Sequence, residues 1–131
     1  MTTELEVLVW LVGLTILMWL PYIFARIINV GLLPALTYTA DGLSLRPQWA
    51  KRAKQAHYNA IENLAPFAAL VIVAHLANVN NDVTASAALA FFWFRVAHYI
   101  VYTLGIPFGR TLTFAGSWLA QICFLYQILV A

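Results

Sequence analysis

The sequence predicts an all-α integral membrane protein in which four transmembrane helices pack as a bundle. Of its 131 residues, 63% are hydrophobic and 9% are charged, whereas a soluble domain averages about 45–50% apolar and about 25% charged residues. Four apolar segments approach the roughly 20 residues that a membrane-spanning helix needs. Because short turns join the later segments, neighbouring helices are expected to be antiparallel. The chain is expected to form one domain over residues 1–131.

The first two spans are separated by a long polar stretch. The first span is expected from about Leu5 to Ile28, with a kink at Pro21. Its uncharged run is too long for the apolar part of a signal peptide, so we expect a retained span. The second span is expected over about Asn59 to Ala77. Its helix should begin near Pro47, because Pro suits a first helical turn, and should project into the cytoplasm before it enters lipid.

The last two spans are bounded by turn residues. The third is expected over about Val83 to Leu104, between a polar turn at 78–82 and a Gly- and Pro-containing turn at 105–109. The fourth is expected over Thr111 to Ala131, a stretch without a charged residue. The lone Cys123 lies within it, and a packing role is the simplest interpretation.

Lys and Arg residues predict the orientation in the membrane. The first loop, about residues 29–58, contains four of them, and Arg110 follows the third span. Basic residues favour cytoplasmic loops, so both termini are expected outside the cytoplasm, with lipid as a partner. The net charge of +2 is too small to suggest nucleic-acid binding.

Polar residues recur at helical spacing inside the second and third spans. Asn59 and Glu62 share one face of the second helix, and Arg95, His98 and Tyr102 share one face of the third. Ionisable residues within a membrane are costly, and they mark functional sites by default. Glu62 and Arg95 carry opposite charges and are expected to pair.

This inventory predicts the chemistry of a ligand. Arg52, Arg95 and Arg110 can bind carboxylates, and Glu62 can accept a hydrogen bond from an amine. Tyr102 and Asn59 can add neutral hydrogen bonds. Such a set suits a zwitterion with more carboxylates than amines. A thiol beside Arg110, at the start of a helix, would be shifted toward thiolate. The lipid-facing end suits an apolar second substrate, and the scattered histidines do not have metal-ligand spacing.

Structural interpretations compete with these functional ones. Glu62 and Arg95 could serve only as a buried pair that fixes helix register. The basic residues of the first loop could simply be a topology signal that contacts lipid headgroups. His57 is as compatible with lining the cytoplasmic mouth as with having no role in a site.

Two motifs resemble those of the MAPEG family, the membrane-associated proteins of eicosanoid and glutathione metabolism. The second helix carries the pattern Arg52-x-x-x-x-His57-x-Asn59-x-x-Glu62-Asn63-x-x-Pro66-Phe67. The third carries Arg95-Val96-Ala97-His98-x-x-x-Tyr102, and Arg110-Thr111 matches the start of the family's fourth helix. The resemblance extends over the whole chain and is closest to the bacterial branch, which implies a bacterial inner-membrane protein.

The resemblance implies a homotrimer that binds glutathione as a co-substrate between neighbouring subunits near the cytoplasmic face. The implied glutathione-binding residues are Asn59, Glu62, Arg95, His98, Tyr102 and Arg52. The implied catalytic residue is Arg110, which would stabilise the thiolate. The chain departs from the prostaglandin- and leukotriene-forming members at Gln55 and Tyr58, where those members carry arginines, and at Phe114, where some members have a tyrosine.

Three functions fit the sequence to different degrees. The leading hypothesis is a glutathione-dependent transferase or peroxidase that acts on lipophilic electrophiles or lipid hydroperoxides. The alternative is a non-catalytic MAPEG-like protein that binds lipid or regulates a partner. A small multidrug exporter also fits four spans with a membrane glutamate, but it does not account for the cluster of Arg95, His98, Tyr102 and Arg110.

Overall fold

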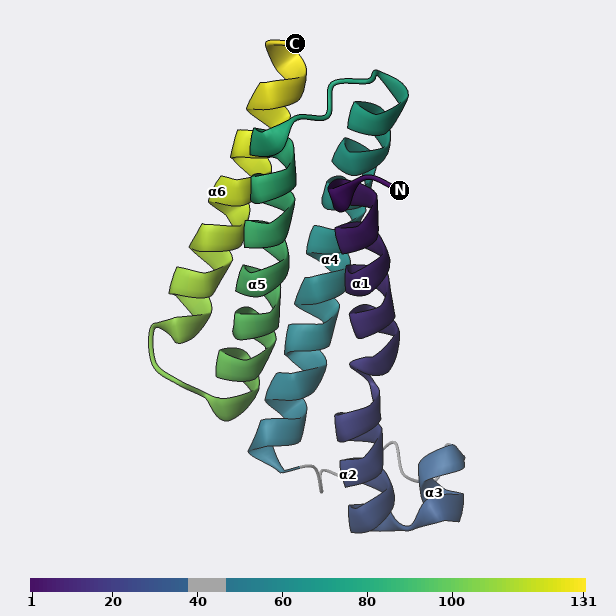
Figure 1. Ribbon diagram of the computed structural model, residues 1–131. Helices are drawn as coiled ribbons and strands as arrows, with labels where there is room; N and C mark the ends of the chain where they lie inside the picture. The colour runs from purple at the N-terminus through teal and green to yellow at the C-terminus, as the bar shows by residue number, and fades with distance from the viewer. Residues whose placement is uncertain (38–46) are drawn as a thin grey trace.

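The computed structural model describes residues 1–37 and 47–131, and within these ranges the chain is helical without strands. The helices are α1 (Thr3–Leu17), α2 (Leu20–Val30), α3 (Leu32–Leu36), α4 (Gln48–Leu76), α5 (Asp82–Leu104) and α6 (Gly109–Leu129) (Figure 1). Four helical stretches are long and apolar enough to cross a membrane: Thr3–Val30, Gln48–Leu76, Asp82–Leu104 and Gly109–Leu129. The predicted all-α fold with four membrane-length helices is therefore confirmed. Residues 38–46 of the expected first loop lie outside the described ranges.

The first membrane-length stretch is interrupted between α1 and α2. The interruption falls at Met18 and Trp19, and Pro21 lies in the first turn of α2. Proline lacks an N–H, and its ring clashes with the carbonyl four residues earlier, which belongs here to Leu17. The expected kink at Pro21 is thus a break that begins a few residues before the proline.

Helical structure extends into the stretch that was expected to be a loop. Gly31, at a φ of 88°, separates α2 from the short α3, which has no buried residues. The long α4 starts directly after Pro47 and continues through Pro66. The early start agrees with the expectation from Pro47, and it places Lys51 and Arg52 in the first two turns of α4.

The apolar core lies between α1, α4 and α5, and Ala120 and Phe124 of α6 join it. Phe67 of α4 stacks on Phe91 of α5 with ring centroids 4.1 Å apart, and Phe124 of α6 approaches Phe67 edge-on at 6.0 Å. All three rings are almost completely buried. Aromatic pairs in these geometries contribute roughly 0.5–1.5 kcal/mol beyond their buried area. They fix the depth at which the three helices meet.

Polar contacts close the core at the end that carries both termini. Asn81 caps α5 through a capping box with Thr84. The Thr84 hydroxyl also hydrogen-bonds to the Glu4 carboxylate of α1, and both residues are buried. The negative charge of Glu4 at the N-terminus of α5 is favourable because it complements the helix dipole.

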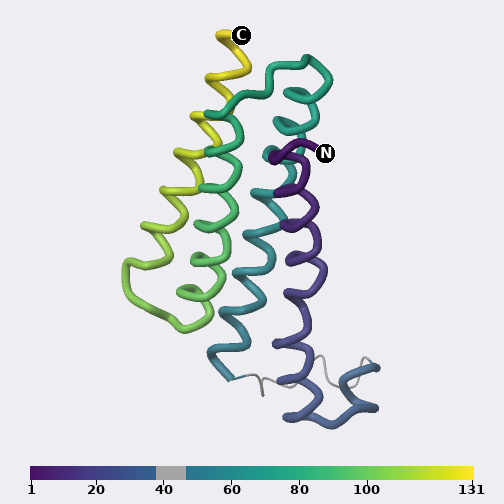
Figure 2. Tube along the Cα trace, in the orientation of Figure 1, coloured from purple at the N-terminus to yellow at the C-terminus, as the bar shows by residue number. Residues whose placement is uncertain are grey.

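The helices are arranged so that α6 lies on the far side of α5 from α1 (Figure 2). Gly116 permits the close approach of α6, because a Cβ at this position would overlap the ring of Phe94 on α5. The start of α4 and the α5–α6 turn lie at the opposite end from the termini. A groove opens at this end between α4, the α5–α6 turn and the first turn of α6.

Candidate functional site

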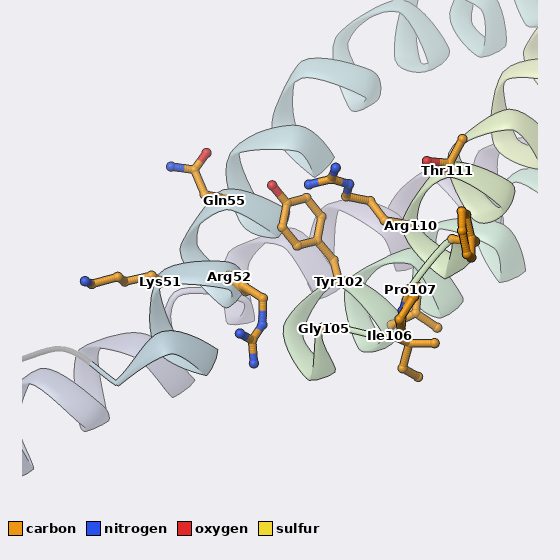
Figure 3. Close-up of a pocket in the computed structure, with 11 residues that line it drawn as sticks. Lys51, Arg52, Gln55, Tyr102, Gly105, Ile106, Pro107, Arg110 and Thr111 are labelled. Carbon is orange, nitrogen blue, oxygen red and sulfur yellow. The ribbon is translucent and has the colours of Figure 1, made fainter.

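Two connected spaces lie at the basic end of the bundle. The larger is a groove of about 470 Å³ between α4, the C-terminus of α5 and the start of α6 (Figure 3). The smaller is a pocket of about 270 Å³ lined by Asn59, His98, Tyr102, Arg110, Thr111 and Phe114. Tyr102, Arg110 and Thr111 line both spaces. Arg110 therefore stands where the two spaces meet.

The guanidinium of Arg110 is held in place by an aromatic ring. Its Cζ lies 5.1 Å from the centroid of the Tyr102 ring, a distance typical of a cation–π contact. Arg110 is exposed and lies in the first turn of α6. Its guanidinium makes no hydrogen bond or ion pair with the described residues. An anion in either space could therefore bind it without displacing an internal partner.

His98 presents an unused polar atom at the pocket. The residue is 1% exposed, and its Nδ1 has no hydrogen-bond partner among the described residues. Its ring meets Tyr102 edge-on at 5.5 Å and lies 6.4 Å from Phe114. A buried polar atom without a partner costs roughly 1–3 kcal/mol. His98 also lines the smaller pocket.

Arg95 and Glu62 do not form the expected ion pair. The Arg95 side chain is 3% exposed, and its Nη2 donates a 2.7 Å hydrogen bond to Oδ1 of Asn59. Glu62 is exposed on α4 and lines neither space. One turn of helix separates Asn59 from Glu62, and the shorter, neutral side chain takes the position facing α5. The pairing prediction was wrong because opposite charge alone does not determine which residue of a helical face meets a neighbouring helix.

Arg95 also lies behind the pocket and not in it. Its Nε and Nη1 are buried without partners among the described residues. Arg95 also lines a void of about 10 Å³ together with α1 residues such as Thr15, and this void is large enough for about one water molecule. In this subunit, Arg95 reaches the pocket through Asn59, which it orients.

Arg52 is already engaged with the end of α5. Its Nε donates a 3.0 Å hydrogen bond to the backbone carbonyl of Thr103. Gly105, at a φ of 70°, gives the guanidinium room, because a Cβ there would lie 3.0 Å from Arg52 Cζ. A cation at a helix C-terminus is favourable. Arg52 lines only the larger groove, and its remaining nitrogens point away from Tyr102 (Figure 3).

Sequence reasoning missed several residues that line the two spaces. Thr111 was quoted only as part of a motif, yet it lines both. Phe114 had been named from the sequence only as a departure from the family's tyrosine, and it lines the smaller pocket. The Tyr22 hydroxyl and His57 Nδ1 share a buried hydrogen bond of 2.9 Å between α2 and α4. That pair had no local signal, and it holds His57 outside the pocket.

The described ranges contain no cluster of side chains suited to bind a metal ion. No group of three or more His, Cys, Asp or Glu side chains there could hold an ion. The polar groups that do converge are the cations, amides and hydroxyls around Tyr102 and Arg110. These groups bind anions and neutral polar ligands.

Comparison with known proteins decides the family. The sequence profile described as the MAPEG family matches residues 5–130. The chain belongs to the MAPEG family. No curated protein and no solved structure gave a significant match. MAPEG proteins include glutathione-dependent transferases and peroxidases as well as non-catalytic members. The family and the four apolar helices together make the chain a multi-pass membrane protein.

The MAPEG motif residues separate into two structural groups in this chain. Asn59, His98, Tyr102 and Arg110 converge on the small pocket. Arg95 supports Asn59 from behind, Arg52 joins α4 to α5, and Glu62 faces outward. The four converging residues form the candidate site.

Proposed function

We propose that the protein is a glutathione-dependent membrane enzyme of the transferase or peroxidase type. Its acceptors would be lipophilic electrophiles or lipid hydroperoxides. The position of Arg110 carries the proposal. A free guanidinium, held on the Tyr102 ring at 5.1 Å, begins a helix at the junction of a polar pocket and a groove with apolar walls.

Each part of the site has a chemical task in this proposal. Glutathione would lie in the smaller pocket, with hydrogen bonds from Asn59, His98 and Tyr102. Its sulfur would lie near Arg110, where the guanidinium and the N-terminal end of α6 both favour thiolate over thiol. The lipophilic acceptor would enter from the side of the larger groove. Arg110 would therefore be the catalytic residue.

The thiolate could react in two ways. With an electrophilic carbon, sulfur forms a C–S bond while the leaving group departs with its electron pair. With a hydroperoxide, sulfur attacks the terminal oxygen and the O–O bond breaks. The alkoxide takes a proton to become the alcohol, and the sulfenic acid reacts with a second glutathione to give the disulfide and water. Both reactions need the same thiolate, so Arg110 serves either.

Assembly would complete the site. The pocket is open in the single chain. Glu62 is exposed on α4, one helical turn after the pocket residue Asn59. In a homotrimer, the neighbouring subunit would cover the open side, and Glu62 would face the glutathione amine there. We further propose a bacterial inner-membrane location with both termini outside the cytoplasm, which places the site at the cytoplasmic side.

A non-catalytic function has two observations in its favour. Gln55 and Phe114 line the two spaces but lack the charge or hydroxyl found at these positions in some MAPEG members. Arg52 is also occupied by the Thr103 carbonyl. The protein would then bind lipid or regulate a partner while keeping the same fold.

Arg110→Ala separates the two functions. In the enzyme, loss of a charge-assisted contact of about 1.5–3 kcal/mol lowers turnover roughly 10- to 150-fold. Folding should be unchanged, because Arg110 is exposed. Turnover of an aryl halide and of a lipid hydroperoxide measures the effect, with Arg110→Lys as the charge-retaining control. Wild-type protein without turnover of either substrate would favour the non-catalytic function. Activity that survives Arg110→Ala would show that another residue stabilises the thiolate.

A further inference from the structure

The larger groove combines three cations with an apolar wall. Lys51 and Arg52 come from the first two turns of α4, and Arg110 comes from α6. The α5–α6 turn provides Ile106 and Pro107 on the other side (Figure 3), and Phe108 of the same turn also lines the groove. Among the described residues, no Asp or Glu lines this groove. It therefore favours a ligand that is anionic at one end and apolar at the other.

The apolar wall is exposed where a chain could leave the groove. Phe108 is 82% exposed and Ile106 is 45% exposed. Phe108 has a φ of 63°, a region that bulky residues rarely occupy. A bulky, exposed aromatic side chain at this strained position gains nothing from packing inside the subunit. Contact with an acyl chain would bury it.

The position of the groove in the membrane also favours an anionic lipid as the ligand. The groove lies at the end of the bundle that holds the basic residues, which the positive-inside rule assigns to the cytoplasmic leaflet. Anionic phospholipids concentrate in that leaflet, and basic pockets between transmembrane helices bind their headgroups.

We propose that this groove binds the phosphodiester headgroup of an anionic phospholipid, with Lys51 and Arg52 on the phosphate and Ile106 and Phe108 against the acyl chain. Arg52 is then a lipid contact in place of the glutathione contact that the family resemblance implies. The inference rests on the proposed function in one respect. Because the groove and the pocket share Tyr102 and Arg110, the bound lipid defines the acceptor class as derivatives of anionic phospholipids.

Lipid binding can be measured without any thiol. The full-length protein in a neutral detergent is titrated with phosphatidylglycerol, phosphatidylcholine or inorganic phosphate, and the rise in unfolding temperature gives the apparent affinity. Phosphatidylglycerol should stabilise the protein at far lower concentration than the other two. Equal stabilisation by phosphatidylcholine would overturn the headgroup assignment. Equal stabilisation by inorganic phosphate would show that the groove binds free anions and would overturn the lipid assignment.

Two lysines on α4 provide a matched comparison. Lys51 lines the groove, whereas Lys54 lies over the Tyr58 ring at 5.6 Å and does not line it. A lysine near an anionic lipid contributes an affinity factor of about fivefold. Lys51→Gln should weaken phosphatidylglycerol binding by about that factor, and Lys54→Gln should leave it unchanged. Equal losses in both variants would indicate general surface attraction and would contradict a defined site.

A third variant tests the apolar wall. Phe108→Asn removes the ring, and Asn tolerates a positive φ, so the turn should fold. If Phe108 contacts the acyl chain, the wild-type protein should bind long-chain phosphatidylglycerol more tightly than short-chain phosphatidylglycerol. Phe108→Asn should abolish this difference in affinity, while Lys51→Gln should still weaken binding in the Phe108→Asn background. An unchanged chain-length preference would remove Phe108 from the site. If Lys51→Gln weakens glutathione binding and spares lipid binding, the groove is part of the thiol site and the lipid proposal fails, while the proposed enzyme stands.

Discussion

Among the described residues, one hydrogen bond orients the buried guanidinium of Arg95. Nη2 donates to Oδ1 of Asn59 at 2.7 Å, and Asn59 in turn lines the small pocket. Nδ2 of Asn63 donates to the Asn59 backbone carbonyl at 2.8 Å, which adds a bond at the same turn of α4. The network places Arg95 as a support for Asn59. The stability of the bundle should therefore depend on Asn59 and not on Glu62.

Asn59→Ala and Glu62→Gln test this dependence. Asn59→Ala leaves the Arg95 guanidinium buried without a partner and should lower the free energy of unfolding by about 1.5–3 kcal/mol. Glu62→Gln changes an exposed side chain and should stay within about 0.5 kcal/mol of wild type. Unfolding temperatures in detergent measure both. A Glu62→Gln loss as large as that of Asn59→Ala would mean that the carboxylate neutralises Arg95 after all.

Close packing between α5 and α6 depends on one glycine. A Cβ at Gly116 would overlap the Phe94 ring, whereas Gly13 in α1 has no atom within 4 Å of its Cβ position. Overpacking costs roughly 1–3 kcal/mol. Since α6 carries Arg110, a shift of α6 would also displace the guanidinium from Tyr102.

Gly116→Ala should therefore destabilise the protein, and Gly13→Ala should not. Both changes replace a helical glycine, so they share the same gain in helix propensity, and the clash is the difference between them. We expect a lower unfolding temperature and reduced turnover for Gly116→Ala alone. Equal behaviour of the two variants would show that Phe94 rotates away and that the close approach does not position α6.

The positive-inside rule predicts the orientation of the whole molecule. Both termini lie at the end opposite the α5–α6 turn and the start of α4. The side of the membrane on which the termini lie therefore determines the side on which the site lies. A reporter that is active only in the cytoplasm should be inactive when fused after Ala131. A reporter inserted at Phe108 should be active. A strong signal from the C-terminal fusion would place the site on the outer side of the membrane and would separate it from cytoplasmic glutathione.

Much of this molecule could be predicted from sequence because its main signals are local. Apolar length predicts four membrane-length helices, and Pro47 predicts the start of α4. Helical spacing places His98 and Tyr102 on one face of α5, and the short turn after α5 predicts Arg110 at the same depth. Contacts between helices depend on packing that no local pattern specifies. Three such contacts between helices could not be predicted. They are the hydrogen bond of Arg95 to Asn59 in place of Glu62, the bond of Arg52 to Thr103, and the Tyr22–His57 pair. Oligomeric state depends on surfaces of more than one subunit, so the homotrimer stays a prediction.

The most direct test of the proposed function is the ultraviolet thiolate absorbance when the detergent-purified protein is mixed with glutathione. If Arg110 and the start of α6 stabilise thiolate, the wild-type protein should give a signal that saturates with glutathione. The signal should disappear with S-methylglutathione, which has no ionisable thiol, and should fall at least about tenfold in affinity or amplitude in Arg110→Ala. A wild-type protein that binds glutathione without forming thiolate, or gives no signal at any glutathione concentration, would contradict the proposed function.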